Sequence, residues 1–215
     1  MLLRTMNISR RAGFSFALIA LLALGLGGFS LLEMRRMNQQ SLEVDQNWQP
    51  SIVAANALAL TSTQIRTITL RMLVVRDHDD VQALLKRVGE LDEQLNRQQG
   101  VYEKLITEAE ERSAYERFLS AKAAYIKEQH RVVELVRQGH KEAAIDVVDG
   151  GSFLTHADAM LKELLDIIDT NTRGGVAAAQ LSSEVFQGAI AMVVLIMLIV
   201  VALTIALALL LTRSI

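Results

Sequence analysis

Two long stretches without a charged residue, one near each end of the sequence, constrain the fold more than any other feature. Twenty consecutive uncharged residues run from Gly13 to Leu32, and twenty-five run from Gly188 to Thr212. About 20 apolar residues span the hydrocarbon core of a bilayer as an α-helix, so each stretch is long enough. The sequence therefore predicts transmembrane helices over residues 12–32 and 188–212, on either side of an extramembranous centre, residues 33–187.

The charged residues divide the sequence in the same way. All 24 acidic residues lie between Glu33 and Glu184, and the centre holds 18 basic residues beside them. The only charged residues of the two ends are Arg4, Arg10, Arg11 and Arg213. Because Lys and Arg are enriched on the cytoplasmic side of membrane helices, we expect residues 1–11 and 213–215 in the cytoplasm. Residues 33–187 then lie on the outer side, in the periplasm of a Gram-negative host, and the chain is a multi-pass protein of the inner membrane.

The first apolar stretch follows a basic start, as it would in a secretory signal peptide. Its apolar run is longer than the hydrophobic region of a typical signal peptide, and no small-residue cleavage site follows it. The sequence therefore favours an uncleaved membrane anchor.

The centre repeats its apolar residues every three or four positions, which indicates amphipathic α-helices and not strands. One such seam consists of Val81, Leu84, Val88, Leu91, Leu95, Gln98, Tyr102 and Leu105. Similar seams start at Ala54, Phe118 and Phe153, and the last of them continues into the second apolar stretch. Pro50 lies inside the first helix and should bend it locally. We predict an all-α fold, an antiparallel four-helix bundle flanked by two transmembrane helices.

Polar segments mark the expected turns of this bundle. Asp77–Asp80 supplies side chains that suit a helix N-cap, and the charged stretch from Glu108 to Ser113 is expected to form the second corner. Gly139 should interrupt the third helix, and Gly150–Ser152 should form the last corner.

Several classes of function find no support in the residues present. The sequence has no cysteine, which excludes disulfides, thiolate metal sites and cysteine nucleophiles. Asp77–Asp80 with His78 suits a solvated corner better than a metal site, because adjacent residues do not share one helical face. No catalytic Ser/His/Asp set or phosphate-binding glycine loop occurs, and the acidic centre disfavours nucleic acid. We therefore expect no enzymatic activity, cofactor, metal site or nucleic-acid partner.

Three short segments add to this layout. Asn47–Ile52 lies early in the first helix, Gln64–Arg71 has the pattern Gln-x-Arg-x-x-x-x-Arg, and Leu211–Ile215 closes the second apolar stretch. Together with the two spans they resemble the sensor half of a bacterial methyl-accepting chemotaxis receptor with a four-helix-bundle ligand domain. Leu211–Ile215 is similar to the segment that begins the HAMP linker in that family. The resemblance implies a receptor truncated there, whose HAMP and signalling domains are absent from this chain.

The resemblance also implies a ligand site. In the resembled receptors, arginines of this element bind the carboxylates of the ligand, whose planar geometry matches a guanidinium fork. Here they correspond to Arg66 and Arg71. The family's third arginine falls at Val75, and the nearest arginine in this sequence is Arg76. A threonine near the start of the last helix contributes in the family, and Thr155 is the nearest candidate.

The spacing of the arginines favours a homodimer. Arg66, Arg71 and Arg76 are five residues apart, which places successive ones about 140° around a helix, so one helix cannot direct all three at a ligand. In a two-fold dimer packed through the first helix, Arg66 of one subunit could face Arg71 of the other. The stripe expected at that interface consists of Ile52, Asn56, Ala59, Thr63, Arg66, Leu70 and Leu73.

The function predicted from these features is that of a chemoreceptor sensor module. It would bind a small anionic solute, an amino acid or another carboxylate, at the periplasmic dimer interface. Binding would displace the last helix by about 1–2 Å, as in other interface helix shifts, and signal to the cytoplasm. Two alternatives stay open: the same module on a histidine kinase or a diguanylate cyclase, and a ligand-free, membrane-anchored structural coiled coil.

Overall fold

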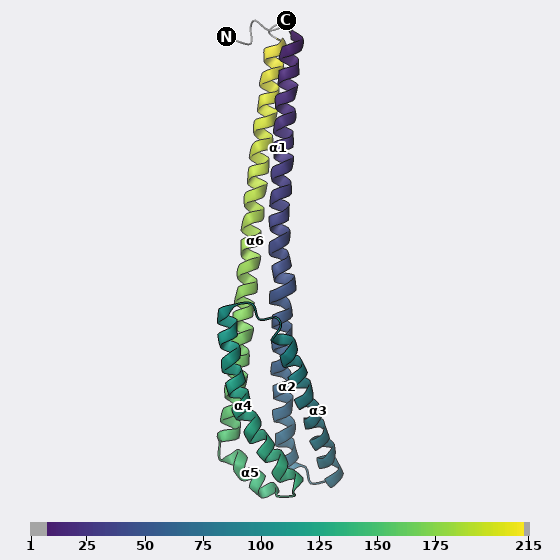
Figure 1. The fold of residues 1–215 in the computed structure, drawn as a ribbon, viewed down its shortest axis with the longest axis vertical. Coiled ribbons are helices and arrows are strands. Elements are labelled where there is room, and N and C mark those ends of the chain that lie inside the picture. Colours follow the sequence, from purple (N-terminus) through teal and green to yellow (C-terminus); the bar gives the residue numbers. More distant parts are fainter. Residues whose placement is uncertain (1–7, 213–215) are drawn as a thin grey trace. The chain divides into compact units, whose positions relative to one another are not determined.

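The computed structural model describes residues 8–212 (Figure 1). Arg4 and the predicted start of the linker at 213–215 lie outside the described residues. Within the described range the regular structure is helical throughout, without a strand, which confirms the predicted all-α class. The chain divides into two compact units, one of the residues up to Glu43 together with those from Ala177 onward, the other of Val44–Val176.

The first unit contains both apolar stretches. Helix α1 (Ile8–Glu43) and the C-terminal part of α6 (Ser152–Thr212) run side by side within it. Each stretch holds an 18-residue window that is long and apolar enough to cross a membrane, and none of either window is buried inside the structure. Large side chains such as Leu24 and Leu198 are exposed there. The chain therefore has two helices that could span a membrane.

The second unit is a bundle of long helices joined by short connections. Its elements are η2 (Val44–Trp48), α2 (Gln49–Val74), α3 (His78–Tyr102), α4 (Ala109–Arg137), the short α5 (Lys141–Asp149) and the N-terminal part of α6. The four long helices α2, α3, α4 and α6 alternate in direction (Figure 1), as short connections require. The predicted antiparallel four-helix bundle is confirmed.

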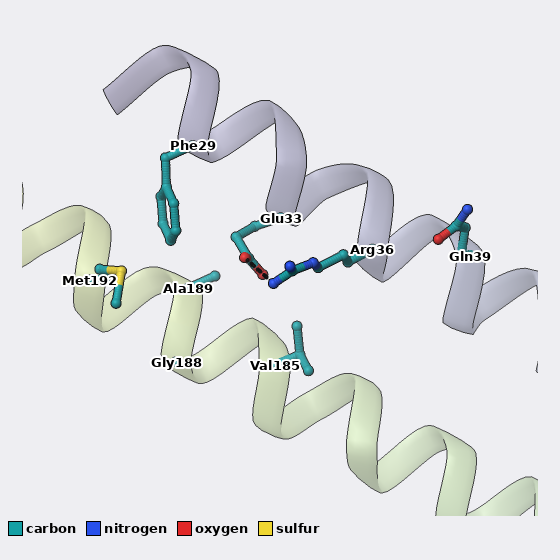
Figure 2. Close-up of a pocket in the computed structure, with 8 residues that line it drawn as sticks. All are labelled: Phe29, Glu33, Arg36, Gln39, Val185, Gly188, Ala189 and Met192. Carbon is teal, nitrogen blue, oxygen red and sulfur yellow. Dashed lines mark hydrogen bonds and ion pairs between the residues drawn. The ribbon is translucent and has the colours of Figure 1, made fainter. Parts of the chain in front are cut away.

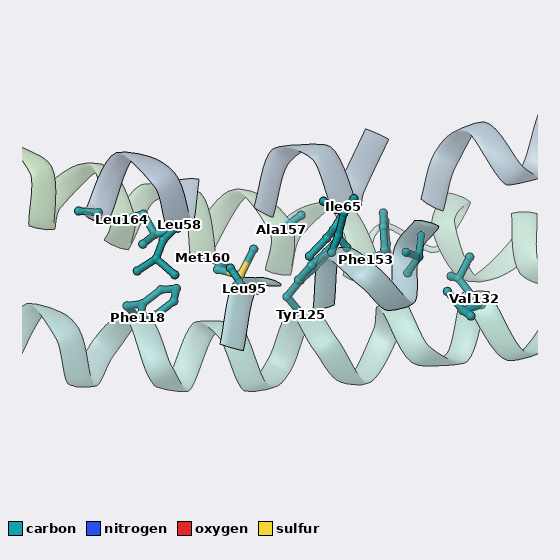
Figure 3. Close-up of a cluster of buried hydrophobic side chains, with 14 of the residues drawn as sticks. Leu58, Ile65, Leu95, Phe118, Tyr125, Val132, Phe153, Ala157, Met160 and Leu164 are labelled. Carbon is teal, nitrogen blue, oxygen red and sulfur yellow. The ribbon is translucent and has the colours of Figure 1, made fainter. Parts of the chain in front are cut away.

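Apolar side chains from all four long helices meet inside the bundle (Figure 3). The fully buried ones include Leu58, Ile65, Leu95, Phe118, Tyr125, Met160 and Leu164. These residues follow the spacing of three and four read from the sequence, so the predicted seams are the core. Since burying one such aliphatic or aromatic side chain contributes about 1.5–3 kcal/mol, the seams supply most of what holds the four helices together.

Three of the expected turns lie where the sequence predicts them. The Asp77 carboxylate accepts a hydrogen bond of 3.1 Å from the backbone N–H of Asp80 and so caps α3. Gly139 and Gly151 have φ angles of 80° and 83°, in the left-handed region that glycine enters without steric cost. They separate α4 from α5 and α5 from α6.

The second corner differs from the prediction. The connection occupies residues 103–108, whereas residues 109–113, expected to form part of the corner, already belong to the first turns of α4. The charged run does not form a solvated turn. One of its members, Glu111, lies in the first turn of α4 and is fully buried. Its carboxylate accepts hydrogen bonds inside the bundle, and a buried polar group is tolerated when it is paired in this way.

The local distortion expected at Pro50 takes the form of the π-helical turn η2 immediately before it. Proline lacks a backbone N–H, and in a regular helix its ring meets the carbonyl four residues earlier, which here belongs to Gln46. A turn widened by one residue moves that carbonyl away from the ring.

Trp48, the only tryptophan of the chain, packs against a pair of glycines on α6. A Cβ atom at Gly174 would lie 2.3 Å from Cη2 and Cζ3 of the indole, and one at Gly175 would lie 3.3 Å from the Trp48 Cβ. Carbon atoms in good contact are about 3.5–4.0 Å apart. The indole therefore occupies the space that a side chain at position 174 would need.

Candidate functional site

Arg66 lies on α2 and its side chain reaches α6. Its Nη1 donates to Oδ1 of Asp158 at 2.6 Å, a contact between residues 92 apart in the sequence. The Arg66 side chain is 29% exposed and that of Asp158 is 66% exposed. A pair this open to water contributes little stability. The guanidinium has five N–H donors, so it retains donors for a second acceptor beside Asp158.

Arg71 and Arg76 are both exposed, and within the described part of the chain neither forms an ion pair. Arg71 belongs to the last turn of α2, whereas Arg76 lies in the connection to α3. Thr155 is exposed in the first turn of α6. Because α2 and α6 are antiparallel and Arg66 meets Asp158, Arg71 is level with the first turn of α6. The fold thus brings Arg71 and Thr155 to one end of the bundle.

The interface stripe predicted on α2 is only partly exposed. Ala59, Leu70 and Leu73, three of its members, pack against the core. The exposed apolar side chains of α2 are Val53, Leu60 and Val74, with exposed fractions of 64%, 61% and 76%. Their spacing of seven and fourteen residues makes one seam along the helix, as in a coiled coil. The apolar surface on α2 is therefore rotated from the predicted stripe, because the packing against α3 and α4 fixes which side of α2 faces inward.

A buried polar network that the sequence-based candidates missed joins α3, α4 and α6. The Glu111 carboxylate accepts hydrogen bonds from the Tyr102 hydroxyl at 2.6 Å, from Asn171 Nδ2 at 3.0 Å and from the backbone N–H of Thr107 at 3.3 Å. Burial raises the pKa of Tyr102 above its ordinary value, and the hydrogen bond to Glu111 raises it further. The signal available in the sequence was Asn171, a polar residue at a core position of the last seam.

A groove of about 330 Å³ lies between α3 and α4, within the second unit. Leu95, Leu119 and Ile126 provide its apolar part. Its polar side chains are Asp92, Asn96, Gln99, Lys122 and His130. No residue of this groove belongs to the predicted ligand site, so it is a separate feature of the bundle.

A second cavity, of about 510 Å³, lies in the first unit between α1 and α6 (Figure 2). Glu33 and Arg36 of α1 form an ion pair of 2.9 Å there, and Val185, Gly188 and Met192 face them from α6. The pair lies next to Leu32, the last residue of the predicted first span. Among the described residues, no cluster of three or more His, Asp or Glu side chains could hold a metal ion.

Comparison with known proteins gives the family of this four-helix arrangement. The family described as a four helix bundle sensory module for signal transduction matches residues 5–186. The chain belongs to this family. The match covers the bundle and the helix before it, and it makes the protein a sensory module of the kind found in chemotaxis receptors, with two helices that could span a membrane.

One curated relative of the sensory module carries the name of a sensory transducer protein, YvaQ, from Bacillus subtilis (strain 168). The two are 21% identical over 184 residues, which is 85% of this chain and 32% of the relative. The chain thus spans about a third of the length of the protein it matches.

Proposed function

We propose that this sensory module binds a small anionic solute, an amino acid or an organic acid, between two copies of the chain and transmits the event through α6 to cytoplasmic signalling domains in chemotaxis. Arg71 carries the proposal. Its guanidinium is exposed beside the first turn of α6, without a carboxylate partner among the described residues. Such a guanidinium is available to a ligand carboxylate, to which it can donate two parallel hydrogen bonds.

The ion pair between Arg66 and Asp158 supplies a coupling between ligand and helix. A ligand carboxylate that approaches Arg66 competes with Asp158, which belongs to α6. Because the pair is partly exposed, exchanging one carboxylate for another costs little. Binding would then release α6 from α2 at this level. Arg76 and Thr155 contribute at the margin of the site, Arg76 as a further cation and Thr155 through its hydroxyl.

The dimer is supported by the exposed seam on α2. Val53, Leu60 and Val74 are apolar and repeat with the seven-residue period of a coiled coil. A two-fold axis along this seam would place the same helix of the second copy against it. We propose that the seam is the homodimer contact and that the ligand lies at its margin, where the arginines of both copies are accessible.

Transmission is supported by the continuity of α6, a single helix of 61 residues that contains both the fourth bundle helix and the second apolar stretch. A helix without a break can pass a displacement of about 1–2 Å along its length. We propose that residues 33–187 lie outside the cytoplasm, in the periplasm of a Gram-negative host, that both ends are cytoplasmic, and that the protein resides in the inner membrane.

Ligand binding by the full chain in lipid nanodiscs tests the proposal. A panel of amino acids and dicarboxylates is screened by thermal unfolding, because a ligand at 100 times its Kd stabilises by about 2.7 kcal/mol. Calorimetry on the hit should show affinity at least about tenfold weaker in Arg71→Ala, since each charge-assisted bond contributes roughly 1.5–3 kcal/mol. Arg71→Lys should restore only part, because an ammonium lacks the planar fork.

Two variants make the result specific. Asp158→Asn removes the carboxylate that competes for Arg66, so it should bind the same ligand more tightly than the wild type. Arg97→Ala removes another exposed arginine, on α3, whose side chain pairs with Glu93, and should leave the affinity unchanged. Unaltered affinity in Arg71→Ala would move the site elsewhere, and no response to any anion would favour the ligand-free coiled coil.

A further inference from the structure

The cavity between α1 and α6 is apolar at one end and charged at the other (Figure 2). Phe29 of α1 lies opposite Met192 and Ala189 of α6 at the apolar end. Glu33 and Arg36 lie at the charged end. Both helices belong to the first unit here, so the cavity lies within one compact part of the chain. Its volume of about 510 Å³ is within the range of small-molecule sites, about 300–1,000 Å³.

Arg36 retains hydrogen-bond donors at the charged end. Its Nη1 donates to Glu33 Oε1 at 2.9 Å, and because a guanidinium has five N–H groups, this contact leaves donors unused. The Arg36 side chain is 71% exposed, whereas that of Glu33 is 13% exposed. The cation is therefore accessible to a further anion, while the carboxylate that orients it is largely enclosed.

Hydrocarbon suits the apolar end of the cavity better than water does. A bound water needs about two to four polar partners, and the side chains of Phe29, Ala189 and Met192 offer it no strong donor or acceptor. Gly188 also lines the cavity, and a Cβ atom at this position would meet no described side chain within 4 Å. The α6 wall is therefore open enough for an acyl chain to lie against it.

The position of Arg36 along α1 matches the depth of lipid headgroups. Arg36 is four residues beyond Leu32, the last residue of the predicted first span, which is about 6 Å along a helix. The headgroup region extends about 5–8 Å beyond the hydrocarbon core on each side of a bilayer. With both helices in a membrane, as in the proposed function, the Arg36 guanidinium is level with the lipid phosphates and Phe29 is level with the acyl chains.

We propose that this cavity binds one phospholipid, whose phosphate accepts hydrogen bonds from Arg36 and whose acyl chain lies along Phe29, Ala189 and Met192. A guanidinium matches the oxygens of a phosphate with its planar fork of donors. The walls of the cavity are apolar first and cationic beyond, which is the order of the groups in a phospholipid from chain to headgroup. The charge and the polarity of the cavity thus both fit this class of molecule.

The lipid site and the proposed anion site share no residue. The lipid site belongs to the first unit, whereas Arg66 and Arg71 belong to the second. The lipid site rests on the proposed function for one point only, the placement of α1 and α6 in a membrane. Lipid binding at Arg36 can therefore fail while anions still bind at Arg71, and the reverse, so the two failures are distinguishable.

Native mass spectrometry of the full chain in a maltoside detergent tests the proposal, because it counts bound lipids and subunits together. The probe is lysophosphatidylglycerol with one oleoyl chain. The matched control is mono-oleoylglycerol, which has the same chain without the phosphate. One lysophosphatidylglycerol per chain should bind, at least about tenfold more tightly than the control. Equal affinity for the two would refute a phosphate site, and displacement of the lipid by an equal concentration of soluble glycerol phosphate would refute a lipid site.

Two matched pairs of variants make the test specific. Arg36→Ala should weaken binding of the lysophospholipid at least about tenfold, whereas Arg35→Ala, which removes an exposed neighbour outside the cavity, should leave it near the wild type. Gly188→Leu should fill the cavity and weaken binding with Arg36 intact, whereas Gly25→Leu, at an open glycine of α1 outside the cavity, should not.

Wild-type affinity in both Arg36→Ala and Gly188→Leu would refute the site. If Gly188→Leu changes the number of subunits and leaves the bound lipid in place, the cavity is occupied by a second copy of the chain and the proposal is wrong.

Discussion

The contact between Trp48 and α6 predicts that an alanine at position 174 lowers the free energy of unfolding, although alanine is more favourable than glycine inside a helix. Gly174→Ala would place a Cβ atom 2.3 Å from two atoms of the indole and 2.8 Å from a third. The ring is rigid and buried, so the conflict is relieved only by moving Trp48 or α6. Overpacking of this kind costs about 1–3 kcal/mol, and here the rigid ring places it near the upper end.

Helix propensity acts in the opposite direction. Alanine is more favourable than glycine inside a helix by about 0.8–1.0 kcal/mol. The net expectation for Gly174→Ala is a loss of about 1–2 kcal/mol in the free energy of unfolding. For the bundle this corresponds to a fall of roughly 4–8 °C in Tm. Gly89→Ala, in α3 with no atom within 4 Å of the new Cβ, should show only the propensity term and gain about 0.5–1 kcal/mol.

The assay is unfolding of the full chain in detergent by guanidinium, followed by circular dichroism and by tryptophan fluorescence. Because Trp48 is the only tryptophan, the emission reports on this contact alone, and Gly174→Ala should shift it. Trp48→Leu combined with Gly174→Ala should recover part of the loss, since a double-mutant cycle isolates the interaction between the two sites.

If Gly174→Ala stabilises the protein as much as Gly89→Ala and leaves the Trp48 emission unchanged, the indole does not occupy the space above the glycine.

Three other perturbations follow from the bundle. Glu111→Ala should lower the free energy of unfolding by roughly 3–5 kcal/mol, because three donors each lose a partner worth roughly 1–3 kcal/mol. Glu111→Gln should lower it less, and equal losses for the two variants in guanidinium titrations would count against the network. Asp77→Ala should cost about 1 kcal/mol through the lost cap, whereas Asp77→Asn should stay near the wild type in the same titrations. The free energy of unfolding should fall as pH rises above about 10, because buried Tyr102 and Tyr125 retain their protons in the folded chain after the unfolded chain has lost them. Thermal unfolding of Tyr125→Phe should show a shallower fall with pH, and an identical fall would exclude Tyr125 as a cause.

Much of the fold could be predicted from the sequence, because the decisive signals are local. The length of an uncharged run determines whether a helix can cross a bilayer, and the spacing of apolar residues determines which face of a helix is buried. The same holds for Asp77, whose cap depends on a backbone N–H three residues away, and for Gly139 and Gly151, whose positive φ angles belong to single residues.

Interactions between distant segments could not be predicted in this way. The charged run at residues 108–113 indicated a corner, but Glu111 points inward because Tyr102 and Asn171 donate to it, the latter 60 residues away. Likewise, the arginine pattern on α2 predicted candidates, yet Arg66 proved to be paired with Asp158 on α6 whereas Arg71 is exposed. The periodic pattern is the same for both arginines, and only the position of α6 distinguishes them.

The sequence by itself determined the two apolar helices, the four amphipathic ones and most of the turns between them. The tertiary structure alone decided the rotation of α2, which exposes Val53, Leu60 and Val74 in place of the expected stripe. It also decided which buried side-chain atoms of the described bundle have no hydrogen-bond partner, Tyr115 Oη and Tyr125 Oη among them. The physical reason is that periodicity fixes which residues share a helix face, whereas the angle at which neighbouring helices meet depends on side-chain shapes contributed by several segments at once.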